Sequence, residues 1–404
     1  MDSIRVAYIS FEHPLAETCG GIGAYVDQIA TIMATRGHNV EVFTSTATKK
    51  SSSNEYKNYW VHQIPAKSNA DFRTAVSSVF NAIHQQSPFD IIESAEYGAD
   101  ALVIKQNNPH VPLIVRLHTP TFLVDRLNFI KPSLTTKIRF VAGSILRGRL
   151  PQPYWKKKTV IDIEEDIYKL ANTVTSPSKS LAAIVMDEWG KRDIKVLPNP
   201  YAPSQQLLKV RHQADGEKFR VLFLGRLEQR KGIYTLLSAI PQILKGNSNV
   251  FFTFAGADQP SYKKNLSVKA LMLNKLSAHT NHLEFLGQVG NTQLNEVFAN
   301  ADVCVLPSIW ENFPNACLES MAAGIPVIGS RAGGMAEIIT YDKDGYLIEP
   351  KSPGELANAV LKLTGDKALL QKLGNAARQT VLERYNADVI GEATENIYWQ
   401  TIKK

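Results

Sequence analysis

Short apolar runs rich in β-branched residues alternate with longer stretches of helical periodicity along the whole chain. The runs predict strands at 4–10, 39–44, 60–64, 90–93, 113–118 and 173–176, and then at 220–225, 250–256, 283–287, 302–307, 326–330 and 346–348. Helical periods lie between them, among others at 23–36, 180–189, 233–244, 292–300 and 353–363. Several strands are apolar at nearly every position, which is typical of strands covered on both faces. The pattern therefore predicts an α/β protein with parallel sheets and helices on both faces.

A proline-rich and then polar segment at 197–218 separates the two series of strands. It contains Pro198, Pro200 and Pro203, and its polar part ends near Gly216, a composition typical of interdomain linkers. We therefore expect two doubly wound, Rossmann-like domains, at 1–200 and 217–385, that face each other across a cleft.

The composition of the 404 residues, with 44% apolar and 21% charged residues, is that of a globular protein with material for two cores. No apolar run approaches the ~18 residues that span a bilayer, and residues 1–12 lack the pattern of a leader peptide. The cysteines Cys19, Cys304 and Cys317 are too few and too scattered for a disulfide framework or a cysteine-built zinc site. We therefore expect a cytoplasmic protein.

The formal net charge of +7 is concentrated in one segment. Nine basic residues and no acidic residue lie at 126–158, namely Arg126, Lys131, Lys137, Arg139, Arg147, Arg149, Lys156, Lys157 and Lys158. A local patch indicates a surface that meets an anionic partner and argues against a protein that binds nucleic acid. Apolar residues such as Phe140 and Trp155 are interleaved with these cations, which suits peripheral binding to an anionic membrane. A solvated surface and a groove for an acidic acceptor are the alternatives.

A glycine-rich turn, Glu-Thr-Cys-Gly-Gly-Ile-Gly-Ala-Tyr-Val at 17–26, follows the first predicted strand. Glycine lets the backbone approach a ligand, and the first turn of a helix offers unpaired N–H groups to a phosphate. Gly21 and Gly23 are the candidate contacts. Val26 stands where the dinucleotide fingerprint requires its third glycine, which disfavours a nicotinamide cofactor. A tight turn without a ligand is the alternative.

A cationic loop opens the second domain. The predicted strand ends at Gly225 and is followed by Arg226, Arg230 and Lys231, at the sheet edge where open α/β sheets bind ligands. Cations just before a helix are not stabilised by the helix dipole, so we expect an anion such as a diphosphate to compensate them. A solvated basic loop is the alternative.

Two glutamates flank the start of a predicted helix that begins near Pro314 and ends at Gly324. Glu311 lies in the preceding loop and Glu319 in the first two turns. Because helical side chains lean toward the N-terminus, both carboxylates can face one ligand. The positive helix end favours their ionised forms, which accept hydrogen bonds from hydroxyls. Unrelated surface glutamates are the alternative for an isolated pair.

Taken together, these motifs resemble the retaining, nucleotide-sugar-dependent glycosyltransferases of family 4, which have the GT-B fold. The resemblance covers essentially the whole chain. It rests on Gly20-Gly21-Ile22-Gly23, Arg116-Leu117-His118-Thr119-Pro120, Thr175-Ser176-Pro177-Ser178, Gly225-Arg226 with Lys231-Gly232, the pair Glu311 and Glu319, the run at 321–330, and Gly333-Gly334. Two positions depart from the frequent family pattern: Asn312-Phe313-Pro314 replaces Gly-Phe-Gly, and Pro198-Asn199-Pro200 replaces Pro-Asn-Gly.

For the second domain, the resemblance implies that Arg226 and Lys231 hold the donor diphosphate beside Gly225. Glu319 would accept hydrogen bonds from the ribose hydroxyls, and Val289 would lie against the base.

For the transferred sugar, the resemblance implies that Glu311 binds its hydroxyls, with the backbone N–H groups of Phe313, Asn315 and Ala316 nearby. His118 would sit at the reacting sugar, and Gly21, in the turn that includes Gly23, would approach the phosphate from the first domain. Pro314 has no N–H, so one possible backbone donor is missing.

The resemblance further implies transfer of a hexose from a UDP-sugar, with UDP-glucose favoured, to a polysaccharide or lipid-linked glycan in cell-envelope or exopolysaccharide synthesis. The first domain would bind the acceptor, the second the donor, and a helix at 386–404 would pack back on the first domain. No metal or other cofactor is expected, and His279-x-x-His282, which has metal-like spacing but no third ligand, is expected to be structural. A GDP-sugar is the first alternative to a UDP-sugar as the donor. A nucleotide-sugar epimerase and a non-catalytic sugar-binding relative are the alternative functions.

Overall fold

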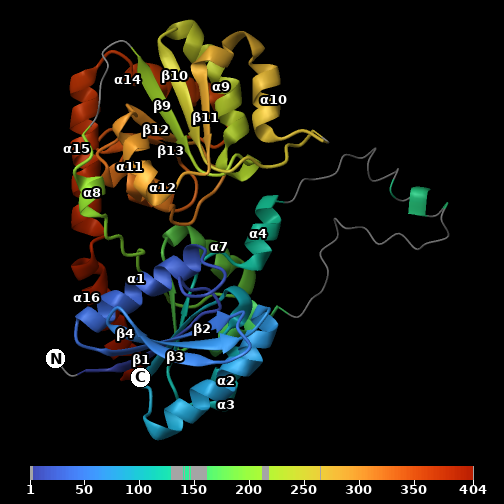
Figure 1. Cartoon of the computed structure of the whole chain (residues 1–404), viewed down its shortest axis with the longest axis vertical. Coiled ribbons are helices and arrows are strands. Elements are labelled where there is room, and N and C mark those ends of the chain that lie inside the picture. The colour runs from blue at the N-terminus through green and yellow to red at the C-terminus, as the bar shows by residue number, and fades with distance from the viewer. Residues whose placement is uncertain are drawn as a thin grey trace.

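Strands in the order β3-β4-β2-β1-β5-β6-β7-β8 form the first of two sheets in the computed structural model (Figure 1). The model describes residues 3–128, 162–211, 218–263 and 265–403, together with residues 140, 142–144 and 146. The strands are β1 (Arg5–Ile9), β2 (Asn39–Thr46), β3 (Ser52–Tyr56), β4 (Tyr59–Pro65), β5 (Ile91–Ala95), β6 (Leu113–Arg116), β7 (Thr173–Ser176) and β8 (Ile194–Val196). We call the part built on this sheet the N-terminal lobe.

The second sheet has the order β11-β10-β9-β12-β13-β14, and all its strands are parallel. The strands are β9 (Phe219–Leu224), β10 (Val250–Ala255), β11 (Leu283–Gly287), β12 (Val303–Leu306), β13 (Val327–Ser330) and β14 (Gly345–Ile348). We call the part built on it the C-terminal lobe. The predicted α/β class with two doubly wound sheets is confirmed.

Two edge strands, β3 and β8, were not predicted. β8 has only three residues, too few to form a recognisable apolar run. β3 pairs with β4 in the antiparallel direction, whereas the sequence predicts parallel sheets only. Its residues, Ser-Ser-Asn-Glu-Tyr, are mostly exposed at the edge of the sheet, so the strand has no apolar pattern to reveal it.

Helices cover both faces of each sheet (Figure 1). Those of the N-terminal lobe are α1 (Gly21–Thr35), α2 (Asn69–Gln86), α3 (Leu102–Asn107), α4 (Thr121–Asn128), α6 (Ile163–Leu170) and α7 (Lys179–Trp189). Those of the C-terminal lobe are α8 (Gln205–Leu208), α9 (Ile233–Gly246), α10 (Val268–Lys275), α11 (Asn291–Ala299), α12 (Asn315–Ala322), α13 (Met335–Ile338), α14 (Pro353–Leu363) and α15 (Lys367–Arg384).

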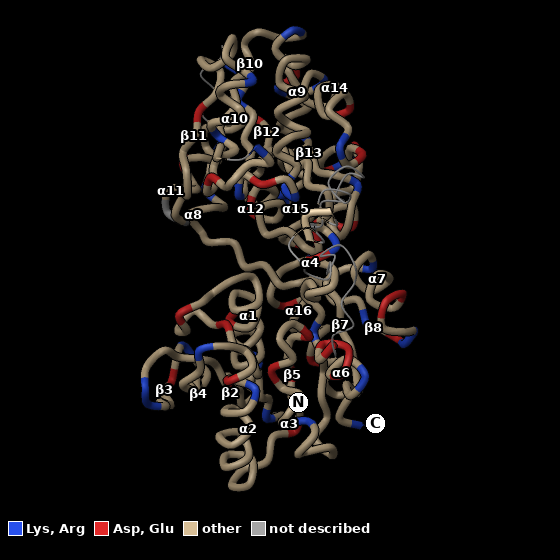
Figure 2. Tube along the Cα trace, turned by 90° about the vertical axis from the view of Figure 1, so that its right-hand side faces the viewer, with Lys and Arg blue, Asp and Glu red and all other residues tan. Residues whose placement is uncertain are grey.

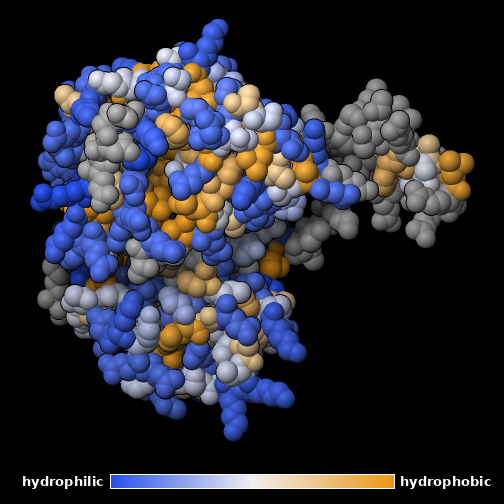
Figure 3. All heavy atoms as spheres, turned by 45° about the horizontal axis from the view of Figure 1, so that its top comes forward, coloured by the Kyte–Doolittle hydropathy of each residue, from blue (hydrophilic) through white to orange (hydrophobic). Residues whose placement is uncertain are grey.

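Each sheet has a hydrophobic core on both faces. In the C-terminal lobe, Phe223 and Ile240 belong to the cluster on one face, while Leu222 and Leu318 belong to the cluster on the other. All four side chains are at most 1% exposed, and full burial of such a side chain contributes about 1.5–3 kcal/mol. Figure 3 shows that mainly hydrophilic side chains surround the apolar ones on the outer face of this lobe.

The last helix, α16 (Ala387–Ile402), packs on the N-terminal lobe, although α15 before it belongs to the C-terminal lobe (Figure 1). The hydroxyl of Tyr398 donates to Glu93 Oε2 at 2.6 Å, and Arg36 Nη2 lies 2.5 Å from Glu395 Oε2. The chain thus crosses between the lobes near residue 200 and again before α16. The two crossings touch, because the Tyr201 N–H donates to the Tyr385 carbonyl at 2.7 Å.

Candidate active site

The cationic loop and the first glutamate lie together at the carboxyl edge of the second sheet. Lys231 Nζ is 2.6 Å from Glu311 Oε1, and Arg230 Nη1 is 3.5 Å from the same oxygen. Glu311 is only 7% exposed, so its charge depends on these two cations. Figure 2 shows basic and acidic residues close together beside α12, on the side of the C-terminal lobe that faces the other lobe.

A second glutamate, Glu228, pairs with the remaining cation of the loop. Its Oε1 atom lies 3.2 Å from both Arg226 Nη2 and Arg230 Nη2. Two carboxylates of the protein thus face the three cations, so part of the compensation that we expected from an anionic ligand comes from the protein itself. Arg226 remains the most accessible of the three, with its side chain 56% exposed.

Glycine at position 232 is required by the way this loop meets the next one. Gly232 has φ +75°, and a Cβ there would lie 1.8 Å from the carbonyl oxygen of Pro307. The Ile309 N–H donates to the Arg230 carbonyl at 2.8 Å, which ties the two loops together. The backbone thus fixes the separation of Lys231 and Glu311.

The pair Gly333-Gly334 holds Glu311 from the other side. A Cβ at Gly333, where φ is +67°, would lie 1.9 Å from the Glu311 carbonyl oxygen, and the Gly334 N–H donates to that oxygen at 2.9 Å. No larger residue fits at position 333. This close backbone contact explains the two glycines by geometry.

The predicted helix after Glu311 is α12, with Pro314 as its N-cap. In the described part of the chain, the N–H groups of Asn315 and Ala316 have no hydrogen-bond partner, so they are free to donate to a ligand. The Phe313 ring, in contrast, is buried and packs edge-to-face on Tyr385, with ring centroids 5.4 Å apart.

Glu319 is half-buried in the second turn of α12. We expected the helix terminus to favour its ionised form, but burial raises the pKa of Glu319. Burial and the charge of Glu319 also raise the pKa of Tyr201, which therefore lies close to this carboxyl. Tyr201 is a site neighbour that sequence reasoning missed.

On the N-terminal lobe, His118 follows β6 and is held by a buried glutamate. The His118 N–H donates to both carboxylate oxygens of Glu96, at 2.9 and 2.8 Å. The ring of His118 packs edge-to-face on Tyr25, with ring centroids 5.3 Å apart. Burial, followed by the charge of Arg116, lowers the pKa of His118 to about 3, so the imidazole is neutral at pH 7.

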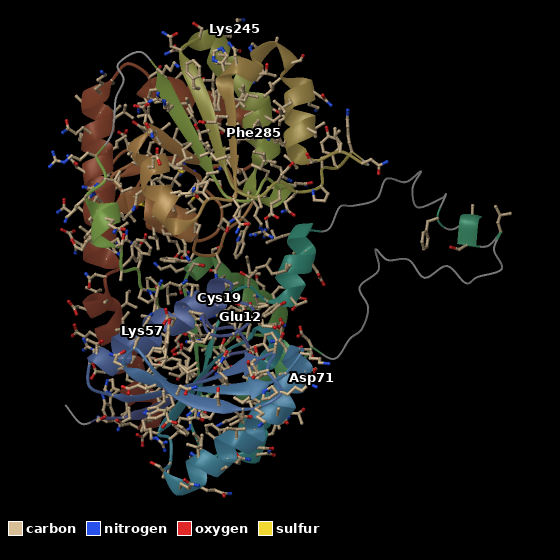
Figure 4. The ribbon with its side chains drawn as sticks, in the orientation of Figure 1. Glu12, Cys19, Lys57, Asp71, Lys245 and Phe285 are labelled. Atoms are coloured by element: carbon tan, nitrogen blue, oxygen red, sulfur yellow. The ribbon has the colours of Figure 1, made fainter. Side chains whose placement is uncertain are left out.

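The glycine-rich turn opens α1 as predicted, but two of its amides already have a partner. Glu12 Oε2 accepts hydrogen bonds from the N–H groups of Gly20 and Gly23, at 2.9 and 3.3 Å. Figure 4 places Glu12 and Cys19 on the side of the N-terminal lobe that faces the other lobe. A carboxylate thus occupies the position at the helix start where we expected an anionic ligand. A Cβ at Gly21 would contact nothing within 4 Å, so internal packing does not require glycine there.

Val289 and the two histidines, His279 and His282, lie apart from this cluster. Val289 is half-buried and lines a cavity with Leu286 and Gln293 between the second sheet and α11. His282 stacks on Phe251 and its Nδ1 hydrogen-bonds with the Val250 carbonyl at 3.0 Å, which is a structural role. Gly225, in contrast, directly follows β9 with φ +143° and lies beside Lys231 of the cluster.

The structure thus brings Lys231, Arg230 and Glu311 together, and it joins them to the N-terminal lobe through Asn312, whose side-chain amide donates to the His118 carbonyl. The sequence reasoning missed Glu12, Glu96, Glu228 and Asn312. Of these, only Glu12 and Glu228 are close in the sequence to the motifs that they contact. Only for these two could the sequence around a motif have indicated the contact.

Most of the basic segment at 126–158 lies outside the described residues, and the prediction that rests on it is not tested. Arg126 itself pairs with Glu188, with 2.5 Å between Nη2 and Oε2. Within the described ranges, no helix combines the length and the apolar character needed to cross a membrane.

Two relatives are similar to this chain in sequence, one over about half of the chain and one over nearly all of it. An uncharacterised glycosyltransferase of Methanocaldococcus jannaschii is 35% identical over 184 residues, which are 46% of this chain and 45% of that protein. The match therefore spans about half the length of this relative. The N-acetyl-alpha-D-glucosaminyl L-malate synthase of Bacillus anthracis is 23% identical over 406 residues, covering 95% of each chain.

Solved structures resemble the whole chain. Sucrose-phosphate synthase from Thermosynechococcus elongatus has a TM-score of 0.74 at 21% identity, with 98% of each chain covered. The Anabaena protein HepE in complex with UDP-glucose has a TM-score of 0.66 at 16% identity, with 98% of this chain and 100% of that chain covered. These likenesses show the GT-B fold.

Two family models match the chain in succession. The model described as Glycosyltransferase Family 4 matches residues 19–205, and the model described as Glycosyl transferases group 1 matches residues 204–380. The chain therefore belongs to the family 4 glycosyltransferases of the GT-B fold.

Proposed function

We propose that this glycosyltransferase moves a hexose from a UDP-sugar, with UDP-glucose favoured, to a polysaccharide or lipid-linked glycan of the cell envelope or an exopolysaccharide. The observation that carries the proposal is that cations, a carboxylate and the His118 segment lie together where the two lobes meet. Lys231 and Arg230 face Glu311, and Asn312, the next residue, contacts the backbone of His118. Cations for a diphosphate and a carboxylate for sugar hydroxyls lie next to each other there.

The donor binds mainly to the C-terminal lobe in this proposal. Lys231 and Arg226 hold the diphosphate, and Arg230 keeps Glu311 neutralised when Lys231 turns toward the phosphate. The free N–H groups of Asn315 and Ala316 donate to ligand oxygens, and Glu319 accepts from the ribose hydroxyls. The complex of HepE with UDP-glucose, a structure of the same fold, supports a UDP-sugar donor.

The proposed reaction retains the anomeric configuration and uses no metal. The bond between sugar C1 and the diphosphate oxygen breaks, and a bond from C1 to an acceptor hydroxyl oxygen forms on the same face of the sugar. The hydroxyl proton passes to the leaving diphosphate, whose charge Lys231 and Arg226 stabilise. His118, neutral at pH 7, hydrogen-bonds the sugar without adding a charge.

A binding screen followed by a turnover assay tests this proposal. Isothermal titration against UDP-glucose, GDP-glucose and ADP-glucose should show the tightest binding for the UDP-sugar, and binding should weaken in Lys231→Ala. Release of UDP in the presence of glycan acceptors should then depend on Glu311. A protein that binds none of the three nucleotide sugars would contradict the proposal. A preference for GDP-glucose would show that the donor is a GDP-sugar and not a UDP-sugar.

The proposal includes peripheral contact with an anionic membrane through the basic segment at 126–158, each cation near the surface contributing about 1 kcal/mol. The protein should co-sediment with phosphatidylglycerol vesicles at low salt and be released at high salt. Failure to sediment at low salt would contradict the membrane contact and leave a solvated surface and a groove for an acidic acceptor as the alternatives.

A further inference from the structure

The segment from Trp310 to Phe313 sends alternate side chains to different lobes. Glu311 faces Lys231 and Phe313 is buried in the core of the C-terminal lobe. Trp310, only 8% exposed, packs instead with the core cluster of the N-terminal lobe, and Asn312 contacts that lobe as well. Glu311 forms a parallel bridge with Gly333, so the backbone is extended there and the alternation has the period of a strand.

The side chain of Asn312 makes two hydrogen bonds, both with the N-terminal lobe. Its Nδ2 donates to the His118 carbonyl, and its Oδ1 accepts from Ser178 Oγ at 3.0 Å. The orientation of the amide follows from chemistry, because a flipped amide would point Oδ1 at a carbonyl oxygen, which cannot donate.

His118 is therefore held from both lobes. Glu96 of the N-terminal lobe accepts from its N–H, and Asn312 of the C-terminal lobe donates to its carbonyl. The position of the imidazole thus depends on contact between the lobes as well as on its own lobe.

A second contact lies next to the first. The carboxylate of Glu337, on α13, accepts from the N–H groups of Lys179 and Ser180 at 2.9 and 3.0 Å. Ser178, the residue that Asn312 contacts, is the N-cap of the same helix, α7. The surfaces approach closely, because a Cβ at Gly334 would lie 3.0 Å from the Cβ of Ser178. We call Asn312, Ser178 and Glu337 the inter-lobe latch.

We propose that Asn312 is a positioning residue that fixes His118 when the lobes close, so that Glu311 and His118 reach their working positions together. Glu311 and Asn312 are adjacent in one extended segment, and each fixes one side of the reacting sugar. The proposal rests on the proposed function for its effect on turnover, but the latch itself is a property of the free protein. Many family members have glycine at this position, which has no side chain to make the two hydrogen bonds of Asn312.

Substitutions separate the two hydrogen bonds of Asn312. Asn312→Asp keeps the size of the side chain and the acceptor for Ser178, but it loses the donor to His118. Ser178→Ala removes only the other bond. Asn108→Ala is the control, because the Asn108 amide also donates to a backbone carbonyl, that of Ile104 at 3.0 Å, but at a site within the N-terminal lobe.

Hydrogen exchange of the free protein tests the latch without any substrate. In Asn312→Asp the amides of Lys179 and Ser180, which donate to Glu337, should exchange roughly tenfold faster. When the lobes separate at Asn312, Glu337 also moves away from these amides. Small-angle scattering should show a larger radius of gyration. Unchanged exchange at 179–180 in Asn312→Asp, or an equal change in Asn108→Ala, would overturn the proposal.

Turnover of UDP-glucose tests the positioning of His118. Asn312→Asp should lower kcat by roughly 10- to 100-fold with KM for UDP-glucose nearly unchanged, and Ser178→Ala should have a smaller effect. Equal losses in both variants would overturn the role of the His118 contact. If the parent protein turns over no nucleotide sugar, the proposed function fails, while the exchange experiment still decides whether the latch exists.

Discussion

The ammonium group of Lys231 lies 2.6 Å from Oε1 of Glu311. The residue that we expect to bind the phosphate therefore pairs with the residue that we expect to bind the sugar. In the donor complex that we propose, the diphosphate would compete with Glu311 for Lys231. Arg230, 3.5 Å from the same oxygen, remains to balance the carboxylate. The ion pair therefore connects donor binding to the orientation of Glu311.

Removal of one member of this pair should cost stability as well as activity. Lys231→Met leaves the largely buried carboxylate of Glu311 with Arg230 as its remaining partner, at 3.5 Å, and we expect a loss of about 1–3 kcal/mol in the free energy of unfolding. The double variant Lys231→Met/Glu311→Gln should be more stable than the sum of the single effects predicts, because no unpaired charge remains. Urea denaturation of the four proteins measures this coupling, and strictly additive effects would contradict it.

Gly21 should matter for the ligand and not for the fold. Gly21→Ala replaces glycine in the first turn of α1, where a Cβ meets open space, so stability should rise by about 0.4–1 kcal/mol. Affinity for UDP should fall, because the methyl group fills the space expected to hold phosphate. Gly354→Ala is the control, since Gly354 lies in the first turn of α14 with equally open surroundings. Calorimetry with UDP should distinguish the two variants, and equal affinities would argue against a phosphate contact at Gly21.

Glu12 should oppose the binding of an anion at the start of α1. Glu12→Gln removes the negative charge that faces the Gly20 and Gly23 amides, so UDP should bind more tightly, most clearly at low ionic strength. The same change should lower stability by about 0.3–1 kcal/mol, because the helix terminus loses a favourable charge. Titration with UDP at two salt concentrations tests this, and weaker binding in Glu12→Gln would show that the carboxylate instead orients the turn for the ligand.

Glu96 should make stability depend on pH. Burial, followed by repulsion from Glu164, raises the pKa of Glu96 to about 8 in the folded protein. The unfolded chain then loses this proton at lower pH than the folded chain, so Glu96 lowers stability progressively as the pH rises from the ordinary glutamate range to about 8. Glu96→Gln should gain stability relative to the parent over this window and show a constant difference above it. Thermal unfolding from pH 5 to 9 measures the difference.

Glu55→Gln, at an exposed glutamate of β3, controls for the loss of one negative charge. A pH-independent difference between Glu96→Gln and the parent would show that the carboxyl is ionised in the folded protein as well.

The parts of the fold that depend on local pattern could be predicted from the sequence. Apolar runs such as Val-Phe-Phe-Thr-Phe gave β10 nearly to the residue, and Pro314 marked the start of α12 because proline suits a helix terminus. β3 could not be predicted, because a polar edge strand is defined by its partner and not by burial.

The site was predictable as a set of residues but not as a set of partners. Arg226, Arg230 and Lys231 look alike in the sequence, and only the folded loops decide that Lys231 and Arg230 meet Glu311 while Arg226 meets Glu228. Asn312 and His118 are 194 positions apart, so no local signal could reveal their contact.

The backbone hydrogen bond between Tyr201 and Tyr385 has a mechanical consequence. Because both connections between the lobes pass through this one place, relative movement reduces to rotation about an axis near it, and displacement grows with distance from that axis. The margin farthest from the axis would open widest, so a ligand can enter the space between the lobes there from the side.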